Sequence, residues 1–162
     1  MSPVSSLVHR ASAVAIGGRA LLIEGPPGCG KSSLALALID RGAALIGDDA
    51  VTLTLNLTRA GKQLIASPPP NIAGMLELRG IGLVQMRVAA PAMAALVLEL
   101  GGAPGERLPQ TPLQRRIIGG VALPVLHLDP GTIAPAQRAE WALALHGLSE
   151  HSPSLTAQSE RE

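Results

Sequence analysis

The sequence predicts an α/β domain built on a mixed sheet, with an α+β arrangement as the alternative. Two short apolar runs, residues 13–16 and 20–23, flank a Gly-Gly-Arg junction, which is typical of a β-hairpin because glycine adopts positive φ. The second run leads through a glycine-rich loop into the helix-like segment 32–41. A strand with an antiparallel neighbour before it and a helix after it is expected in a sheet that holds both strand directions.

The spacing of apolar residues and the positions of glycine and proline predict the elements that follow. The segment 32–41, SSLALALIDR, contains helix-forming residues and no breaker, and Gly42 follows where a helix C-cap is expected. The next segment, AALIGDDAVTL, has the pattern of a buried strand that ends in two acids. The segment QMRVAAPAMAAL contains Pro91 and favours no single element. The other predicted elements are strands at 51–57, 62–66, 95–100 and 123–128, an exposed loop at Pro68-Pro69-Pro70, and a helix over 135–145.

The length of 162 residues predicts one domain, over residues 1–148, followed by a polar tail at 149–162 that we expect to be disordered. Phe and Tyr are absent and Trp141 is the only aromatic residue, so aliphatic side chains and alanines must form the core. The same lack of aromatic rings argues against single-stranded nucleic acid, whose bases stack on such rings.

Charge and cysteine content exclude further classes of function. The thirteen Lys and Arg residues are scattered and the formal net charge is +1, so we expect neither a nucleic-acid nor a membrane partner. Cys29 is the only cysteine, which excludes an internal disulfide and a multi-cysteine zinc site. No apolar run approaches the roughly twenty residues that span a bilayer, and the first residues lack a signal-peptide pattern, so we expect a cytoplasmic protein.

The segment 25–32, GPPGCGKS, matches the phosphate-loop pattern G-x-x-x-x-G-K-[ST] between an apolar strand and a helix. Glycines let backbone N–H groups turn toward phosphate oxygens, and a helix N-terminus adds partial positive charge. In this pattern Lys31 neutralises the β- and γ-phosphates and Ser32 ligates Mg²⁺; a glycine-rich turn without a ligand is the alternative. The residues predicted to bind the nucleotide are Gly25, Pro26, Pro27, Gly28, Cys29, Gly30, Lys31, Ser32 and Ser33.

Asp48 and Asp49 follow the strand-like ALIG, which places them at the carboxyl end of a strand, where ligands bind in open α/β sheets. Side chains alternate along a regular strand, so at most one of the pair then points at the phosphates. One acid can hold magnesium, directly or through water, and the other can accept a proton from an attacking hydroxyl; two turn acids are the alternative. The runs LVLEL at 96–100 and VLHLD at 125–129 also end in acids and can imitate a magnesium-binding strand.

With the acid pair beside the loop, residues 9–145 resemble the C-terminal catalytic domain of HPr kinase/phosphorylase. The segment HRASAVAIGGRALLIEGPPGCGKSSLALALIDRGAALIGDD is similar to the family's histidine, strand, phosphate loop and acid pair in order. MLELRGIGLV at 75–84 resembles the signature Leu-Glu-Ile/Val-Arg-Gly-Leu/Ile-Gly, and Glu106-Arg107-Leu108 stands where that family keeps a catalytic arginine. The resemblance implies a mixed sheet with a phosphate loop and flanking helices, similar to phosphoenolpyruvate carboxykinase.

The resemblance implies an ATP- and Mg²⁺-dependent serine kinase for HPr, the phosphocarrier protein of the phosphotransferase system, or for a paralogue, and hence regulation of carbohydrate metabolism. It also implies a possible reverse phosphorolysis and a possible hexamer. In the implied site, Lys31 and its loop bind the nucleotide, and Ser32 and Glu77 bind Mg²⁺. Asp49 is the proton acceptor and is supported by Asp48. His9 and Arg107 complete the catalytic group.

The residues leave alternatives open. His9 can be an exposed or capping histidine, Glu77 can form a surface salt bridge with Arg79, and Arg107 can be solvated. His127, His146 and His151 have no motif and are interpreted as structural or tail residues.

Three departures separate the chain from the family pattern. Ser33 stands where an acidic residue is usual, the family's N-terminal domain has no counterpart, as in short members, and residues 123–135 lack the arginine-bearing loop of phosphorolysis. Kinase activity is therefore the firmer expectation. The rival functions are a small-molecule kinase and a nucleotide-sensing module without catalysis. Small-molecule kinases usually carry an arginine-rich lid, and in this sequence only Arg115-Arg116 could start one.

Overall fold

A computed structural model describes residues 5–102 and 107–149 of the chain. The predicted disordered tail lies, beyond Ser149, outside these residues. The elements in the described part are β1 (Ser6–His9), β2 (Ser12–Ile16), β3 (Arg19–Glu24), α1 (Lys31–Asp40), β4 (Ala44–Gly47), β5 (Val51–Thr58), β6 (Gly61–Ser67), β7 (Met75–Leu78), β8 (Gly82–Gln85), β9 (Ala92–Leu100), β10 (Arg115–Ile118), β11 (Val121–Leu128) and α2 (Pro135–His146).

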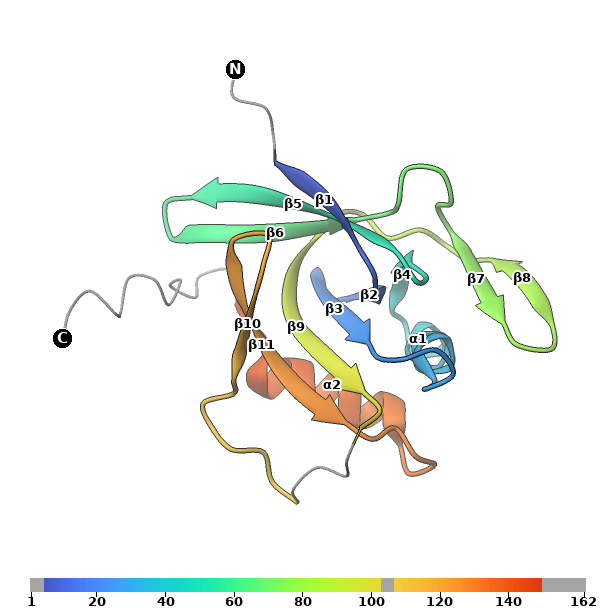
Figure 1. Ribbon diagram of the computed structural model, residues 1–162. Coiled ribbons are helices and arrows are strands. Elements are labelled where there is room, and N and C mark those ends of the chain that lie inside the picture. Colours follow the sequence, from blue (N-terminus) through green and yellow to red (C-terminus); the bar gives the residue numbers. More distant parts are fainter. Residues whose placement is uncertain (1–4, 103–106, 150–162) are drawn as a thin grey trace.

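One curled mixed sheet organises the fold, which confirms the predicted α/β class (Figure 1). Its main path runs β1-β5-β6-β9-β3-β2-β4, and β11 joins β9 while pairing with β10. The long strand β9 is parallel to β3 and to β11 and antiparallel to β6, and the other pairs of this sheet are antiparallel. Because β6 pairs with the start of β9 and β11 with its end, the sheet turns along β9.

The predicted hairpin is confirmed as β2 and β3, which pair from Ser12 with Ile23 to Ile16 with Arg19. Gly17 and Gly18 form its turn with φ of 58° and 84°, and two consecutive positive φ values match the right-handed twist of paired strands. The hairpin places the end of β3, and with it the glycine loop, in the middle of the sheet.

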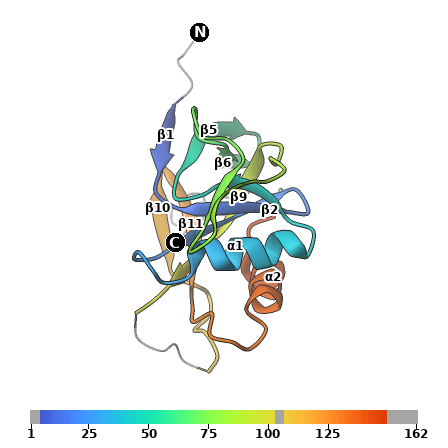
Figure 2. The ribbon, with the colours of Figure 1, turned by 90° about the vertical axis from the view of Figure 1, so that its right-hand side faces the viewer.

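Both helices cover the same face of the sheet (Figure 2). The alternation along β3 divides the core, because Leu21 and Ile23 pack with the helices while Ala20 and Leu22 pack in the interior of the curled sheet. Leucine, isoleucine, valine and alanine make up nearly all of both cores, as the missing aromatic residues predict. No helix within the described ranges is long and apolar enough to cross a membrane.

The helix predicted at 32–41 is α1, shifted by one residue. Its C-cap is Arg41, and the backbone N–H groups of Arg41 and Gly42 donate to the carbonyls of Leu38 and Ile39. Gly42 has a φ of 109°, so the residue after the cap is the one that needs glycine. The predicted C-terminal helix is confirmed as α2, one residue longer than expected.

Three regions differ from the sequence prediction. The strands β1, β7, β8 and β10 were not predicted, and each has only four residues, too few to show a clear period. Strand β9 begins directly after Pro91, three residues earlier than predicted. The proline loop is only partly exposed, because Pro69 is buried over Gly47, whose missing side chain leaves the space that the proline fills.

We expect the Gly47→Ala substitution to lower the free energy of unfolding by at least about 2 kcal/mol. A Cβ at Gly47 would lie 2.1 Å from the carbonyl oxygen of Ala50 and 3.2 Å from Cδ of Pro69, so backbone must move. The matched control is Gly80→Ala, which has a φ of 80° but no atom within 4 Å of the new Cβ, and should lower that free energy by about 1 kcal/mol. If urea denaturation shows that both variants lose the same free energy of unfolding, the prediction is contradicted.

Candidate functional site

The glycine loop, residues 25–32, joins β3 to α1 (Figure 1). Gly25, Gly28 and Gly30 have positive φ, and a Cβ on Gly25 would lie 2.6 Å from both the Leu100 carbonyl oxygen and Sγ of Cys29. The loop therefore packs against the end of β9 so closely that only glycine fits at its first position. Cys29 is partly buried inside the loop.

Lys31 lies across the loop that precedes it. Its Nζ donates to the carbonyl oxygen of Gly25 at 2.7 Å and to that of Pro26 at 3.4 Å. Among the described residues no side chain caps the N-terminus of α1, so the backbone N–H groups of its first turn have no side-chain acceptor there. Together these groups concentrate donors and positive charge at one point of the sheet edge.

The carboxylate of Asp48 joins three elements of the site. Its Oδ1 accepts hydrogen bonds from Oγ of Ser32 at 2.8 Å and from Oγ of Ser12 at 3.0 Å, and its Oδ2 accepts from the backbone N–H of Glu77 at 3.0 Å. The structure thus brings Asp48 to the start of α1, as predicted. Ser12 is fully buried and was not predicted as a site residue, although a serine that opens an apolar strand is a usable signal.

Asp49 is turned away from its neighbour. Strand β4 ends at Gly47, and Asp49 has a φ of 62°, so the alternation of a regular strand no longer applies. The Asp49 side chain is 67% exposed, and its Oδ2 lies 4.0 Å from Nη2 of Arg10. The two acids therefore stand in a bend, as the turn alternative expects, but with different surroundings: Asp48 is bound to Ser32 and Asp49 is open to solvent.

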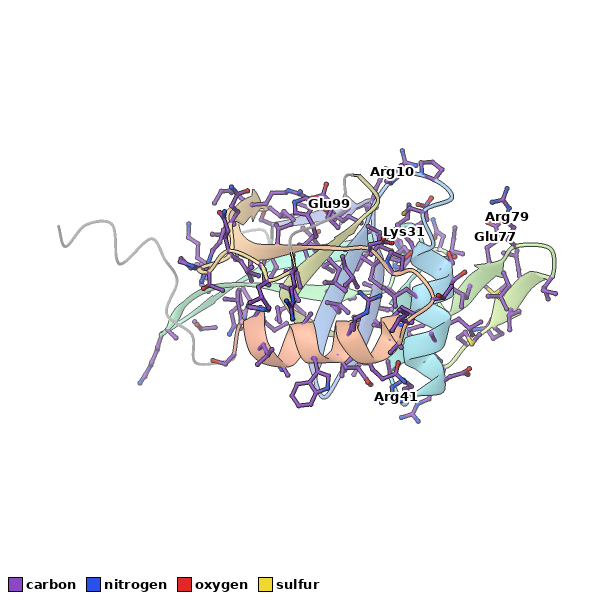
Figure 3. The ribbon with its side chains drawn as sticks, turned by 90° about the horizontal axis from the view of Figure 1, so that it is seen from below. Arg10, Lys31, Arg41, Glu77, Arg79 and Glu99 are labelled. Carbon is purple, nitrogen blue, oxygen red and sulfur yellow. The ribbon has the colours of Figure 1, made fainter. Side chains whose placement is uncertain are left out.

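Glu77 lies on the outer hairpin β7–β8, with Arg79 just beyond the end of β7 (Figure 3). The hydrogen bond from the Glu77 backbone to Asp48 holds this hairpin against the site, and the Glu77 side chain is exposed. No ion pair joins Glu77 to Arg79, both of which the structure describes, so the salt-bridge alternative is wrong. The carboxylate remains available to a ligand.

A charged network, His9–Glu24–Arg116–Glu99, lies at the other side of the loop. His9 Nε2 donates to Oε1 of Glu24, Arg116 Nη1 donates to Oε2 of Glu24, and Arg116 Nη2 donates to Oε2 of Glu99 at 2.8 Å. His9 is 22% exposed and bonded, so the exposed or capping alternative is wrong. Arg116 is part of β10 and is paired with Glu24, so it does not start the lid that a small-molecule kinase would need.

The network perturbs two ionisations. Burial raises the pKa of Glu24, but the hydrogen bond and charge of His9 and the charge of Arg116 outweigh it and hold that pKa below its ordinary 4.5. Burial lowers the pKa of Arg116, and the charges and hydrogen bonds of Glu24 and Glu99 outweigh it and raise that pKa. Glu24 is therefore an ionised carboxylate at neutral pH.

Arg107 lies apart from these contacts. It is exposed and forms no hydrogen bond or ion pair with any residue that the structure describes, but it lines a cavity of about 1020 Å³ that Pro26 of the glycine loop also lines. His127 and His146 line the same cavity, whereas His151 lies outside the described residues. Its walls also include Leu100, Gln110, Leu113, Leu126, Leu128, Arg138, Trp141 and Leu145.

Comparisons with known proteins identify the family of the chain. The family model described as HPr Serine kinase C-terminal domain matches residues 4–90. HPr kinase/phosphorylase of Clostridium botulinum (strain Eklund 17B / Type B) is 45% identical over 73 residues, which cover 45% of this chain and 23% of that protein. The protein of the same name from Burkholderia cenocepacia (strain HI2424) is 31% identical over 116 residues, or 67% of this chain and 35% of that protein.

A solved structure, that of the Hpr(Ser) kinase/phosphatase from Coxiella burnetii, matches with a TM-score of 0.69 at 28% identity, over 85% of this chain and 89% of that one. A curled mixed sheet with few helices and a glycine loop at its centre defines an α/β protein with the fold of that structure. The chain belongs to the HPr serine kinase C-terminal domain family. It spans about a quarter to a third of the length of the two curated relatives.

We expect Glu24→Gln to reduce stability in a pH-dependent way. The folded protein lowers the pKa of Glu24 below 4.5, so its stabilising effect is present above the unfolded value and is lost as the pH falls through the lower folded value. In urea denaturation, the free energy of unfolding of the wild type should exceed that of the variant by a constant amount near pH 7. This difference should shrink below about pH 4.5.

The control is Glu140→Gln, which breaks the more exposed pair with Arg41 and should change the free energy of unfolding by less than about 1 kcal/mol. A margin for Glu24→Gln that does not depend on pH would contradict the prediction.

Proposed function

We propose that the chain is an ATP- and Mg²⁺-dependent kinase that phosphorylates a serine of HPr or a paralogous phosphocarrier. The observation that carries the proposal is the hydrogen bond between Ser32 and Asp48, which joins the glycine loop with its lysine to the acid pair. A nucleotide-holding loop and a proton acceptor are the two parts that phosphoryl transfer to a hydroxyl needs. The names of the relatives support HPr as the substrate.

ATP would bind with its phosphates at the N-terminus of α1, in the manner of a phosphate loop. Lys31 would exchange its bonds to the loop carbonyls for bonds to phosphate oxygens. The cavity beside Pro26 has room for the nucleoside part of the ligand. We also propose the phosphoenolpyruvate carboxykinase-like form of the fold and a possible hexamer, both of which follow from the family resemblance alone.

Ser32 and Glu77 would hold Mg²⁺. Both offer oxygen, the donor that this ion prefers, and Asp48 keeps the Ser32 hydroxyl and the Glu77 backbone on its two oxygens. Within the described ranges no three His, Cys, Asp or Glu side chains form a ready metal cluster, so these oxygens would act together with phosphate oxygens and water. When bound, the ion neutralises charge on the phosphates.

Asp49 would accept the proton of the attacking serine. Its carboxylate is exposed and, among the residues that the structure describes, contacts only Arg10, at 4.0 Å, whereas that of Asp48 accepts three hydrogen bonds. As the serine oxygen bonds to the γ-phosphorus, its proton passes to Asp49, the bond from that phosphorus to the bridging oxygen breaks, and ADP leaves. His9 and Arg107 would complete the catalytic group, with Arg107 stabilising charge on the transferred phosphoryl group.

Labelled ATP, Mg²⁺ and purified HPr should give phosphoserine in HPr with the wild type and no measurable transfer with Lys31→Ala. The control is Lys62→Ala, which removes an exposed lysine of β6 and should leave transfer unchanged. A small-molecule kinase would transfer phosphate only to another hydroxyl compound, and a nucleotide-sensing module would bind ATP without transfer. Wild-type rates in Lys31→Ala would contradict the assignment of the loop.

Asp49→Asn should lower the single-turnover rate of transfer by about 10²–10⁴-fold, because it removes the proton acceptor. Its ATP affinity and stability should change little, since the side chain is exposed. Asp48→Asn should have a milder effect on the transfer step but should lower the free energy of unfolding by about 1–2 kcal/mol, because an amide nitrogen cannot accept a hydrogen bond. A fully active Asp49→Asn enzyme would exclude Asp49 as the base.

A further inference from the structure

The network around Glu24 is built from four separate strands. Glu24 ends β3, and its register partner on the neighbouring strand β9 is Glu99, so the two carboxylates lie side by side on the same face. Arg116 reaches both from β10, and His9 reaches Glu24 from β1. The register of β11 adds His127, whose Nε2 lies 3.8 Å from Oε2 of Glu99.

Both oxygens of Glu24 are used, and its side chain is only 12% exposed. An ionised carboxylate loses much of its hydration at such a site, which costs free energy. Replacing a buried ion pair with apolar side chains therefore often leaves the stability of a protein unchanged or increases it. Leu22, two residues earlier on the same face of β3, belongs to the apolar core. Fold stability alone therefore explains poorly why a carboxylate stands at position 24. Its place directly before the glycine loop points to a role in the function of that loop.

Glu24 is the residue immediately before the glycine loop. Its neighbour Gly25 presents the carbonyl oxygen that accepts Nζ of Lys31, so the loop's first residue connects Glu24 directly to the proposed phosphate site. Because a carboxylate at neutral pH only accepts hydrogen bonds, the proton of the His9–Glu24 bond resides on Nε2 of the histidine. The other ring nitrogen, Nδ1, is then the one left for a further partner.

We propose that Glu24 is a positioning residue for His9: its carboxylate, held by Arg116, which Glu99 binds in turn, sets the orientation of the imidazole ring and the nitrogen that carries the proton. Arg116 prevents the Glu24 carboxylate from turning away, because Nη1 of Arg116 donates to the second oxygen of Glu24. Arg116 is itself held by Glu99, which accepts from Nη2. The inference rests on the proposed function, since it takes His9 as part of the catalytic group.

A double-mutant cycle tests this role. The single-turnover rate of transfer from saturating ATP to HPr, and the Kd for ATP, are measured for wild type, Glu24→Gln, His9→Gln and the double variant. Glu24→Gln should lower the rate about 10–100-fold and change the Kd for ATP less than about threefold. In the His9→Gln background, whose amide still donates toward Glu24, the same substitution should change the rate less than about twofold.

A purely structural role of Glu24 would give a different result. If Glu24 only stabilises the sheet, its substitution lowers the rate by the same factor with or without His9, and that additive outcome overturns the proposal, as does an unchanged rate. Glu140→Gln is the matched control, because Glu140 also pairs with an arginine, Arg41, which lies at the opposite end of α1 from Lys31 (Figure 3). It should leave the rate unchanged in both backgrounds.

Two further measurements keep the test decisive. If Glu24→Gln does not fold, Arg116→Lys replaces it, because lysine keeps the charge but cannot bridge both carboxylates; it should lower the rate about 3–10-fold, and only when His9 is present. The N–H proton of the His9 ring, assigned by its loss in His9→Gln, should give a downfield ¹H NMR signal that moves in Glu24→Gln without any nucleotide. An unmoved signal overturns the inference even if HPr is not phosphorylated, whereas absent phosphorylation by the wild type overturns only the proposed function.

Discussion

The arrangement of the candidate site depends on one carboxylate, that of Asp48. It accepts hydrogen bonds from Ser12 at the start of β2, from Ser32 in the first turn of α1 and from the backbone of Glu77 on β7. The carboxylate therefore links the glycine loop, the central sheet and the outer hairpin at one point. A charge held by three donors is strongly stabilised in place, which is why this acid orients its surroundings.

A second carboxylate, Glu24, fixes the opposite end of the same loop. The glycine loop thus leaves β3 from a residue bound by His9 and Arg116, and enters α1 at a residue bound by Asp48. Between these two anchors the backbone takes positive φ values, and at Gly25 the end of β9 leaves no room for a side chain. Fixed ends and a closely packed backbone keep the donor groups of such a loop preorganised for an anion.

The two halves of the chain relate differently to known proteins. The family match covers residues 4–90, which include the loop, the acid pair and the hairpin β7–β8, whereas β9, β10, β11 and α2 follow it. The structural likeness to the Coxiella protein covers 85% of the chain and therefore extends beyond the stretch that the family model matches. Arg116 and most of the residues that line the cavity belong to this second half, whereas Glu24, to which Arg116 donates, and Pro26 of the cavity wall belong to the first half.

The sequence by itself determined the features that depend on local spacing: the β2–β3 hairpin, the glycine loop, α1, α2 and the place of the acid pair after β4. Periodicity and glycine positions suffice for these, because neighbouring residues make the contacts that form them. Only the tertiary structure decided that Asp48 turns inward while Asp49 faces solvent, that Pro69 is buried, and that Glu24 meets Arg116, which lies 92 residues further along the chain. These features arise from strands of four residues and from side chains distant in sequence, and neither leaves a periodic signal, because their partners are set by how the sheet curls.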